Sequence, residues 1–487
     1  MNSIFSDKKC VGLLGMGREG RSSYALIRGL FPEKEIFLID EKKDFIEQMP
    51  ELKKDEYAKV LVVKNICDFI SHDKEASSID FFLKAPGISL KNYPSLLHDK
   101  RMSSQTEIFL QRYGKQCIGI TGTKGKSTTT NLIYHLLKPF RTVIMAGNMG
   151  IPLFDIVKEI TPDTIVVCEL SSHQLELVSH PPQTGILLNL YEEHLDHYVD
   201  YLAYQRAKMN IFNNGDGVAI FYGGDTLIAQ RFSEIKFRGK KLIYGDELHL
   251  DTQRVDKSLI DTPCALIGHH NNLNKQAAIL AVKEKGLTDV QIKQGLSTFK
   301  TLPHRLEYIG EIEGIYFYND SISTIPQATI AAIESLRMLP FINDVGSVIL
   351  GGFDRGIDYS VLIEYLRRKP VKNIVFTGPA GKRIKETLCC AGVISVCDCA
   401  DSTACADCRA FESNNFADTA YANYSNYSNR PDDYYIFESD NFADIVKWCK
   451  RHTGRGNACL LSPAAASYDQ FRNFEERGSV FTDLVRQ

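Results

Sequence analysis

Short apolar runs recur along the whole chain, and longer stretches with helical spacing separate them. They fall into three groups, in the order 10–14, 35–40 and 81–83, then 117–120, 142–145, 164–168, 185–188 and 217–221, then 314–318, 347–350, 373–376 and 458–461. Continuous apolar runs of this length are typical of buried strands, and their alternation with helices favours parallel sheets. The pattern predicts an α/β protein of three domains, with bounds 1–112, 113–302 and 303–487.

Length and charge agree with this division and narrow the range of partners. The 487 residues match three domains at roughly 150 residues each. The net charge of −3 gives no electrostatic reason to expect nucleic acid or an anionic membrane as a partner. Residues 1–9 lack a secretory signal, and no run approaches the eighteen or so apolar residues of a membrane span. We therefore expect a cytoplasmic monomer that acts on small molecules.

A glycine-rich loop opens the second group of apolar runs. Residues 121–128 read Thr-Gly-Thr-Lys-Gly-Lys-Ser-Thr, between a predicted strand and a predicted helix. Gly122 and Gly125 let backbone N–H groups face a polyphosphate, Lys126 supplies a cation for its outer phosphates, and Ser127 offers a hydroxyl to Mg²⁺. The loop is a short Gly-x-x-Gly-Lys-Ser form of the phosphate loop. It predicts a site for a nucleoside triphosphate.

The first group of runs carries a second glycine loop. Gly15, Gly17 and Gly20 follow the first predicted strand, and Asp40 ends the second strand, 20 residues after Gly20. The turn Pro86-Gly87 follows the third strand, at the same edge of a parallel sheet. Taken alone, this arrangement predicts a dinucleotide cofactor, and a nicotinamide-dependent oxidoreductase is one alternative for the protein.

In the second domain Glu169 is a candidate for metal chemistry, whereas a lone histidine such as His194 would usually be structural. Glu169 and His194 lie just beyond predicted strands, at the sheet edge that also carries the phosphate loop. A carboxylate in that place can reach the Mg²⁺ that accompanies a triphosphate. The spacing of Lys208 alone predicts an ordinary solvated lysine on a helix surface.

Cysteines crowd one short segment of the third domain: Cys389, Cys390, Cys397, Cys399, Cys405 and Cys408. Their Cys-x-Cys and Cys-x-x-Cys pairs could in principle hold zinc. The neighbouring residues are rich in Asn, Ser, Tyr and Asp, which favours a surface insertion near 397–433. We expect no zinc there.

Eight short motifs occur in one order along the chain, at 121–128, 147–150, 169–172, 193–196, 204–208, 270–274, 304–305 and 319–321. Together they resemble the Mur ligase family. The tail at 461–478 is similar to the members that add glutamate to UDP-N-acetylmuramoyl-L-alanine. The resemblance implies a Rossmann-like first domain, a central phosphate-loop ATPase domain with a mostly parallel sheet, and a Rossmann-like third domain. It also implies an ATP-dependent ligase that activates a carboxylate as an acyl phosphate.

The resemblance implies roles for individual residues. The UDP-sugar substrate would be held by Gly15, Gly17, Arg18, Asp40, Pro86, Gly87 and Asn148. ATP would be held by Gly122, Thr123, Lys124, Gly125, Lys126, Ser127, Thr128, Asn271, Asn274, Arg305 and Asp320. Glutamate would be held by Thr324, Arg355, Ser467 and Phe474. Two Mg²⁺ ions would be held by Ser127, Glu169, His194 and a carbamylated Lys208. The catalytic residues would be Lys126, His194, Lys208 and Arg305.

Two positions depart from the pattern of the glutamate-adding members. Ile322 stands where a lysine is usual, and Arg355 stands where a lysine that grips glutamate is common. A subgroup that uses L-glutamate is similar to this chain at the Asp-Ser-Ile segment. We expect D-glutamate, with the same reaction on L-glutamate as the alternative. A catalytically silent binding module with the same fold is a further alternative.

Overall fold

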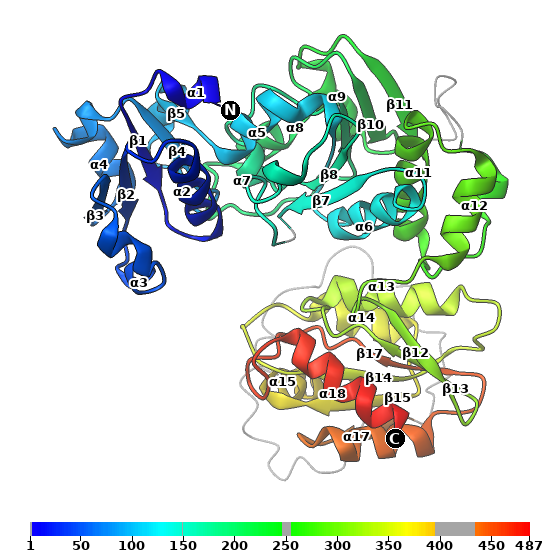
Figure 1. The fold of residues 1–487 in the computed structure, drawn as a ribbon. Helices are drawn as coiled ribbons and strands as arrows, with labels where there is room; N and C mark the ends of the chain where they lie inside the picture. The colour runs from blue at the N-terminus through cyan, green and yellow to red at the C-terminus, as the bar shows by residue number, and fades with distance from the viewer. Residues whose placement is uncertain (1, 149, 246–254, 395–433) are drawn as a thin grey trace. The chain divides into compact units, whose positions relative to one another are not determined.

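The computed structural model describes residues 2–148, 150–245, 255–394 and 434–487, so the predicted insertion at 397–433 lies outside the described residues. The chain forms two compact units, Met1–Cys264 with His270–Phe299 and Ala265–His269 with Lys300–Gln487. Three separate sheets, two in the first unit and one in the second, carry helices on their connections (Figure 1). The predicted α/β class with mostly parallel sheets is confirmed.

The first sheet has five parallel strands in the order β3-β2-β1-β4-β5. The strands are β1 (Cys10–Leu14), β2 (Glu35–Asp40), β3 (Ala58–Val62), β4 (Phe81–Lys84) and β5 (Met102–Ser103). The helices are α1 (Asn2–Ser6), α2 (Arg18–Leu30), α3 (Asp44–Glu47), α4 (Ile66–His72) and α5 (Gln105–Tyr113). The chain runs outward from β1 to β3 and then returns to the other side of β1. The loops after β1 and β4 therefore separate at a topological switch point, where α/β sheets bind ligands.

The second sheet has six parallel strands in the order β11-β10-β9-β6-β8-β7. They are β6 (Cys117–Thr121), β7 (Val143–Gly147), β8 (Ile165–Glu169), β9 (Thr184–Leu187), β10 (Val218–Tyr222) and β11 (Lys240–Tyr244). The helices are α6 (Lys126–Leu137), α7 (Ser172–Leu175), α8 (Tyr201–Met209), α9 (Thr226–Ser233), α10 (Lys257–Ile260), α11 (His269–Glu284) and α12 (Asp289–Thr298). Since β8 and β9 flank β6, the phosphate loop leaves the middle of the sheet beside the ends of both neighbours.

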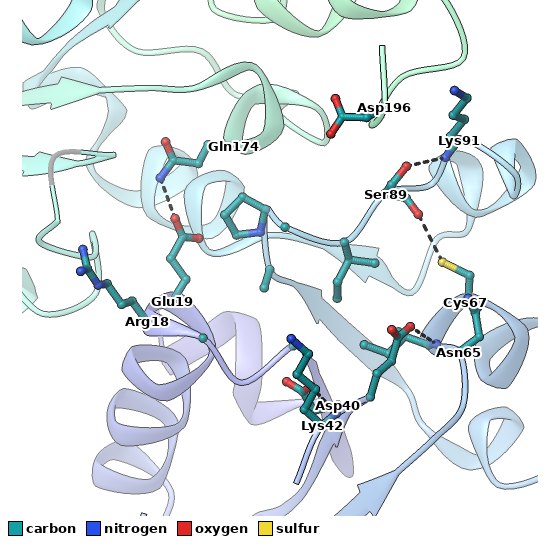
Figure 2. Close-up of a pocket in the computed structure, with 18 of the residues that line it drawn as sticks. Arg18, Glu19, Asp40, Lys42, Asn65, Cys67, Ser89, Lys91, Gln174 and Asp196 are labelled. Atoms are coloured by element: carbon teal, nitrogen blue, oxygen red, sulfur yellow. Dashed lines mark hydrogen bonds between the residues drawn. The ribbon is translucent and has the colours of Figure 1, made fainter. Parts of the chain in front are cut away.

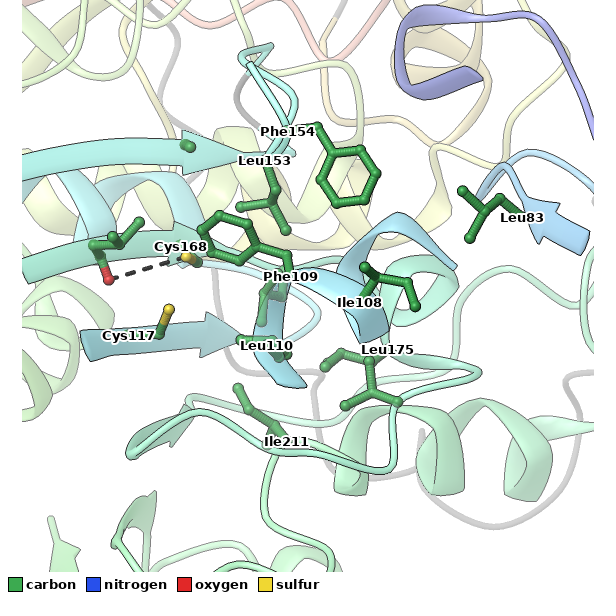
Figure 3. Close-up of a cluster of buried hydrophobic side chains, with 14 of the residues drawn as sticks. Leu83, Ile108, Phe109, Leu110, Cys117, Leu153, Phe154, Cys168, Leu175 and Ile211 are labelled. Carbon is green, nitrogen blue, oxygen red and sulfur yellow. Dashed lines mark hydrogen bonds between the residues drawn. The ribbon is translucent and has the colours of Figure 1, made fainter. Parts of the chain in front are cut away.

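One apolar core joins the first two sheets. Ile108, Phe109 and Leu110 of α5 are buried beside Leu83 of the first sheet and Cys117 of the second (Figure 3). Burial of such side chains stabilises a protein by about 1.5–3 kcal/mol each, so this helix fastens the two sheets to one another. The continuous core explains why both sheets belong to a single compact unit.

The third sheet has the order β12-β13-β17-β14-β15-β16. Its strands are β12 (Glu307–Ile312), β13 (Ile315–Asn319), β14 (Val345–Gly351), β15 (Asn373–Thr377), β16 (Tyr435–Glu438) and β17 (Ala458–Leu461). Its helices are α13 (Pro326–Arg337), α14 (Ser360–Arg368), α15 (Gly378–Cys390), α17 (Phe442–His452) and α18 (Phe474–Arg486). Only β12 and β13 pair antiparallel among these strands, through a tight turn in which Glu313 and Gly314 both have positive φ.

Within the described ranges, no helix has both the length and the apolar composition that crossing a bilayer requires.

Candidate functional site

The phosphate loop lies between β6 and α6, as the sequence predicts. Gly122 has φ 152° and Gly125 has φ 87°, two backbone conformations that favour glycine. A Cβ atom at Gly125 would lie 2.5 Å from Oδ1 of Asn274, so space also requires glycine there. Because α6 begins at Lys126, its first N–H groups have no intrahelical partner and are available to a phosphate.

A neighbouring loop after β9 holds the phosphate loop in place. The backbone N–H of Lys124 donates to Oδ1 of Asn189 at 2.8 Å, and the ammonium of Lys124 pairs with Glu193 at 2.7 Å. The hydroxyl of Thr123 bonds that of Tyr204 at 2.8 Å. The ammonium of Lys126 lies against the loop itself and donates to the carbonyl oxygens of Gly122 and Thr123, both at 2.9 Å. These contacts hold the loop in its conformation through groups of the protein itself.

Glu169 ends β8 with one carboxylate oxygen in use and one without a partner. Oε1 accepts a hydrogen bond from Nδ2 of Asn148 at 2.8 Å. Oε2 is buried and, among the described residues, has no hydrogen-bond donor. An unpaired buried oxygen of this kind is costly, and a hard cation such as Mg²⁺ is the partner that carboxylates prefer. The carboxylate fits a metal ligand beside the triphosphate.

Lys208 is not the solvated helix lysine that its spacing alone predicts, because the residue is only 2% exposed. Its ammonium donates to the carbonyl of Gly122 at 2.9 Å and lies 3.4 Å from the hydroxyl of Thr121. No carboxylate of the described residues pairs with it. Burial, with the nearby charge of Lys126, lowers the pKa of Lys208 well below its usual value.

His194 lies on the loop after β9 with a positive φ of 60°. Its ring packs 4.7 Å from the ring of His173 and 6.1 Å from that of Tyr204, measured between centroids. Burial lowers the pKa of His194, which favours the neutral imidazole that binds metals. In the part of the chain that the structure describes, no three His, Cys, Asp or Glu side chains form a metal cluster. A cation here therefore needs the hydroxyl of Ser127, phosphate oxygens or a modified Lys208 as further ligands.

A pocket of about 820 Å³ opens at the switch point of the first sheet (Figure 2). All of the residues predicted to hold the UDP-sugar line it: Gly15, Gly17, Arg18, Asp40, Pro86, Gly87 and Asn148. They come from the loops after β1, β2 and β4 and from the segment after β7. The structure thus brings this predicted set together in one cavity of a size that suits a sugar nucleotide.

Hydrogen bonds fix the acidic groups of the pocket. The two carboxylate oxygens of Asp40 accept from the backbone N–H groups of Met16 at 2.6 Å and Lys42 at 2.9 Å. Glu19, in the first turn of α2, accepts from Nε2 of Gln174 at 2.6 Å (Figure 2). Burial raises the pKa of Glu19, and the hydrogen bond from Gln174 opposes this rise.

Asn148 contacts both halves of the first unit's site. It lines the pocket, and its amide bonds the carboxylate of Glu169 beside the phosphate loop. A group held in the pocket is therefore close to the residues that would hold the triphosphate. The next residue, Met149, lies outside the described residues.

A buried network at this junction was not predicted from the sequence. The ammonium of Lys84, only 1% exposed, pairs with Glu176 at 2.9 Å and donates to the carbonyl of Ile88 at 2.9 Å. His197 lies 3.7 Å from the same carboxylate, and its carbonyl accepts from Ser89 at 2.6 Å. The network ties the pocket-lining loop after β4 to the loop that carries His194. The sequence signal for this network was Lys84 itself, a lysine that directly continues the apolar run of β4.

We expect Lys84→Met to reduce the free energy of unfolding by about 3–5 kcal/mol, because it removes the ammonium that pairs with the buried carboxylate of Glu176 and leaves that carboxylate only His197, at 3.7 Å. Burial opposes ionisation of Glu176, but its contacts with His197 and Lys84 outweigh burial and lower its pKa. The difference in the free energy of unfolding between the unsubstituted protein and Lys84→Met should therefore be full above about pH 4.5. It should disappear as pH falls through the pKa of Glu176 in the folded state. Urea unfolding at several pH values measures it.

Lys91 offers a matched control for this prediction. Its ammonium joins the same two loops, through the carbonyl of Leu195 at 2.7 Å, but the contact is exposed. Lys91→Met should change the free energy of unfolding by no more than about 0.5 kcal/mol. Equal effects of the two substitutions would show that the buried pair has no special role.

The predicted ATP contacts fall on both units. In the first unit, Nδ2 of Asn274 donates to Oδ1 of Asn271 at 3.2 Å, beside Gly125. In the second unit, Asp320 is buried and accepts from the backbone N–H of Leu306 at 3.0 Å and from the hydroxyl of Ser462 at 2.9 Å. Burial raises the pKa of Asp320 to about 6. Its carboxyl group anchors the segment that contains Arg305.

The predicted glutamate contacts belong to the second unit. Ser467 is buried after β17, and Phe474 is the first residue of α18. Thr324 lies just before α13. The guanidinium of Arg355 lies 5.7 Å from the ring centroid of Tyr468. These segments meet at the carboxyl ends of β13, β14 and β17, which are neighbours in the third sheet.

Comparison with known proteins agrees with this geometry. The family described as Mur ligase middle domain matches residues 120–282. UDP-N-acetylmuramoylalanine--D-glutamate ligase of Clostridium kluyveri is 31% identical over 88% of this chain and 88% of its own length. The enzyme of the same name from Geobacillus kaustophilus is 29% identical over 99% and 98%.

Solved structures show the same fold at low identity. MurF ligase from Thermotoga maritima, in complex with ADP, has a TM-score of 0.54 at 15% identity and covers 98% of this chain and 95% of its own. UDP-N-acetylmuramate-alanine ligase MurC from Thermotoga maritima has a TM-score of 0.53 at 14% identity and covers 98% and 99%. The predicted three-domain α/β architecture is confirmed by this likeness.

The fold and the phosphate loop thus define an ATP-dependent ligase that forms amide bonds. The chain belongs to the Mur ligase family. Membership removes the alternative of a nicotinamide-dependent oxidoreductase, and the glycine loop after β1 lines the pocket of the first sheet.

Proposed function

We propose that the protein adds D-glutamate to UDP-N-acetylmuramoyl-L-alanine at the expense of ATP, a step in peptidoglycan precursor synthesis. The observation that supports this most is the position of Asn148, which lines the pocket and also bonds Glu169 beside the phosphate loop. A carboxylate at the end of a sugar nucleotide in the pocket would then meet the γ-phosphoryl group. The names of the relatives from Clostridium kluyveri and Geobacillus kaustophilus support both the acceptor and the amino acid.

The first step is binding of the UDP-sugar in the pocket. The diphosphate would lie at the N-terminus of α2, where Gly15 and Gly17 allow close approach and Arg18 adds a positive charge. Asp40, with both oxygens fixed by backbone N–H groups, would face the uridine. The turn of Pro86 and Gly87 closes the opposite side.

The second step is phosphoryl transfer to the alanyl carboxylate. Both reactants are anions, so the site must offset their repulsion. Lys126 and the first N–H groups of α6 would bind the β- and γ-phosphates, and Arg305 is proposed to bind the nucleotide as well. When bound, Mg²⁺ neutralises charge on the triphosphate, and Ser127, Glu169, His194 and a carbamylated Lys208 would hold the two ions. The bond between the γ-phosphorus and the β–γ bridging oxygen breaks, and the products are an acyl phosphate and ADP.

The third step is attack by the amine of glutamate on the acyl carbon, which releases inorganic phosphate. We propose that Thr324, Arg355, Ser467 and Phe474 of the second unit bind this amino acid. An acyl phosphate hydrolyses in water, so the amine of glutamate must reach the acyl carbon before water does.

Carbamylation of Lys208 has support from its surroundings. The side chain is buried beside the phosphate loop without a carboxylate partner among the described residues. Reaction of its amine with CO₂ replaces a costly buried cation by an anion that can hold a metal. The family resemblance points to the same modification.

The hand of glutamate is tested by supplying each isomer separately to the full-length protein with ATP, Mg²⁺ and UDP-N-acetylmuramoyl-L-alanine. We expect phosphate release and a glutamyl product with D-glutamate. L-glutamate remains the second candidate because Ile322 stands where a lysine is usual. Product with L-glutamate alone would reject the D assignment.

Three further features complete the proposal. The domain bounds 1–112, 113–302 and 303–487 give each domain one of the three sheets. A supply of ATP and of a nucleotide-linked sugar favours action in the cytoplasm. We also propose that the protein acts as a monomer, since the first unit contains a complete pocket.

A further inference from the structure

The second unit contains a guanidinium that is almost completely buried. Arg477 of α18 is 1% exposed. Its Nε donates to the hydroxyl of Ser321 at 3.0 Å, and its Nη2 donates to the carbonyls of Ser321 at 2.8 Å and Ala465 at 3.0 Å. Its Nη1 donates to the carbonyl of Ala466 at 3.0 Å. Every one of these partners is an uncharged oxygen.

The charge of Arg477 therefore has no counterion of its own. No carboxylate in the described ranges lies within ion-pair distance of it, and Asp469 is the acidic group whose charge affects it. Burial lowers the pKa of Arg477 to about 10, so the guanidinium stays positive at neutral pH. A buried charge is expensive unless it is compensated, and carbonyl dipoles compensate it only in part. The surroundings are thus favourable to an added anion.

The oxygens that Arg477 binds belong to the segments that carry the predicted glutamate contacts. Ser321 lies three residues before Thr324, and Ala466 directly precedes Ser467. The hydroxyl of Ser321 donates in turn to the carbonyl of Phe474 at 2.8 Å. One side chain therefore connects three of the four predicted contacts.

The segment of Arg355 packs against the same guanidinium. A Cβ atom at Gly352 would lie 2.2 Å from the carbonyl oxygen of Ala466 and 2.8 Å from Nη1 of Arg477. The backbone of Phe353 donates to that carbonyl at 2.9 Å. The chain that leads to Arg355 is thus held between the guanidinium and the segment before Ser467.

We infer that Arg477 is the positioning residue of the amino-acid half of the site. It holds the four segments in register, and its incompletely compensated charge favours the carboxylate of the incoming amino acid. The inference rests on the proposed function and adds a residue that touches neither ATP nor the acyl phosphate. Inside a region of low dielectric constant, such a charge acts over longer distances than it would in water.

The test compares Arg477→Lys, which keeps the charge and loses most of the hydrogen bonds, with Arg477→Gln, which loses the charge as well. The full-length protein is assayed for the KM of glutamate and the KM of ATP. We expect the KM of glutamate to rise at least about tenfold in Arg477→Lys and further in Arg477→Gln. The KM of ATP should stay within about twofold.

Trapping of the acyl phosphate with hydroxylamine, in the absence of glutamate, separates a defect in glutamate binding from a general structural defect. A general defect would lower the amount trapped, whereas a defect in glutamate binding alone would not. Trapping should persist in Arg477→Lys at close to the rate of the unsubstituted protein. Arg472→Gln is the matched control, because Arg472 is exposed, lies close along the chain and pairs with Glu476. Its KM for glutamate should not change.

An unchanged KM for glutamate in Arg477→Lys would overturn the inference, as would an equal loss of acyl-phosphate trapping. If neither Arg477 variant accumulates as folded protein, Ser321→Ala decides instead. This substitution removes one contact of the guanidinium and should raise the KM of glutamate about threefold, whereas no change would overturn the inference. Failure of the unsubstituted protein to use either glutamate isomer would reject the proposed function itself.

Discussion

Replacing Lys208 by alanine is expected to lower kcat for ligation by roughly 10²–10³-fold while ATP still binds. The side chain is buried beside Gly122, where the proposed carbamate would hold a metal ion. The phosphate loop itself is built from other contacts, which the substitution leaves in place. Steady-state kinetics and binding of a fluorescent ATP analogue measure the two quantities.

Arg206 provides the matched control because it lies on the same helix with its side chain exposed. Arg206→Ala should retain full activity. A second readout does not depend on turnover: protein equilibrated with ¹³C-bicarbonate should show a carbamate carbon resonance that Lys208→Ala lacks. Unaltered turnover of Lys208→Ala, or the same resonance in both proteins, contradicts the proposed role.

Replacing Glu169 by glutamine is expected to lower kcat at least about 100-fold and to raise the Mg²⁺ concentration needed for half-maximal rate. The substitution conserves size but removes the charge of the carboxylate whose Oε2 has no donor among the described residues. A neutral amide is a weaker ligand for a hard cation. Ligation rates measured over a range of Mg²⁺ concentrations test this.

Glu192→Gln is the control for charge, since Glu192 is exposed and lies on the loop that carries His194. Its kinetics should match those of the unsubstituted protein. If Glu169→Gln kept its rate and its Mg²⁺ dependence, Glu169 would be a structural residue that only orients Asn148.

Strands buried on both faces are the easiest to predict from the sequence, although β7, an edge strand of the second sheet, was predicted as well. β1, β6 and β15 are continuous apolar runs and were predicted within a residue or two. β3 and β16, at the edges of their sheets, were missed although apolar residues occupy 60–63 and 434–437. Several residues of both strands are exposed, as is common in edge strands, so an apolar run alone does not report their burial.

Helix α6 begins at Lys126, three residues before the predicted start at 129. The last residues of the phosphate loop form the first turn of α6. Their side chains are polar, so the hydrophobic pattern does not mark this turn as helical.

In the site, too, residues marked by their neighbours in the sequence could be predicted, and a residue whose partners lie far along the chain could not. The glycine loops, Glu169 and His194 could be predicted because each follows a recognisable strand. Arg477 could not, because its partner Ser321 lies 156 residues away and the absence of a counterion is a property of the folded unit. Residue type alone would assign a solvated arginine to a helix of this composition.

In the proposed mechanism the γ-phosphoryl group passes to the substrate carboxylate before glutamate attacks. In an acyl phosphate the bridging oxygen comes from the carboxylate, and it leaves with phosphate when the amine displaces it. The direct test supplies UDP-N-acetylmuramoyl-L-alanine labelled with ¹⁸O in its carboxylate, together with ATP and D-glutamate, and analyses the phosphate by mass spectrometry. One ¹⁸O atom in each released phosphate is predicted, and product formation with unlabelled phosphate would contradict the mechanism.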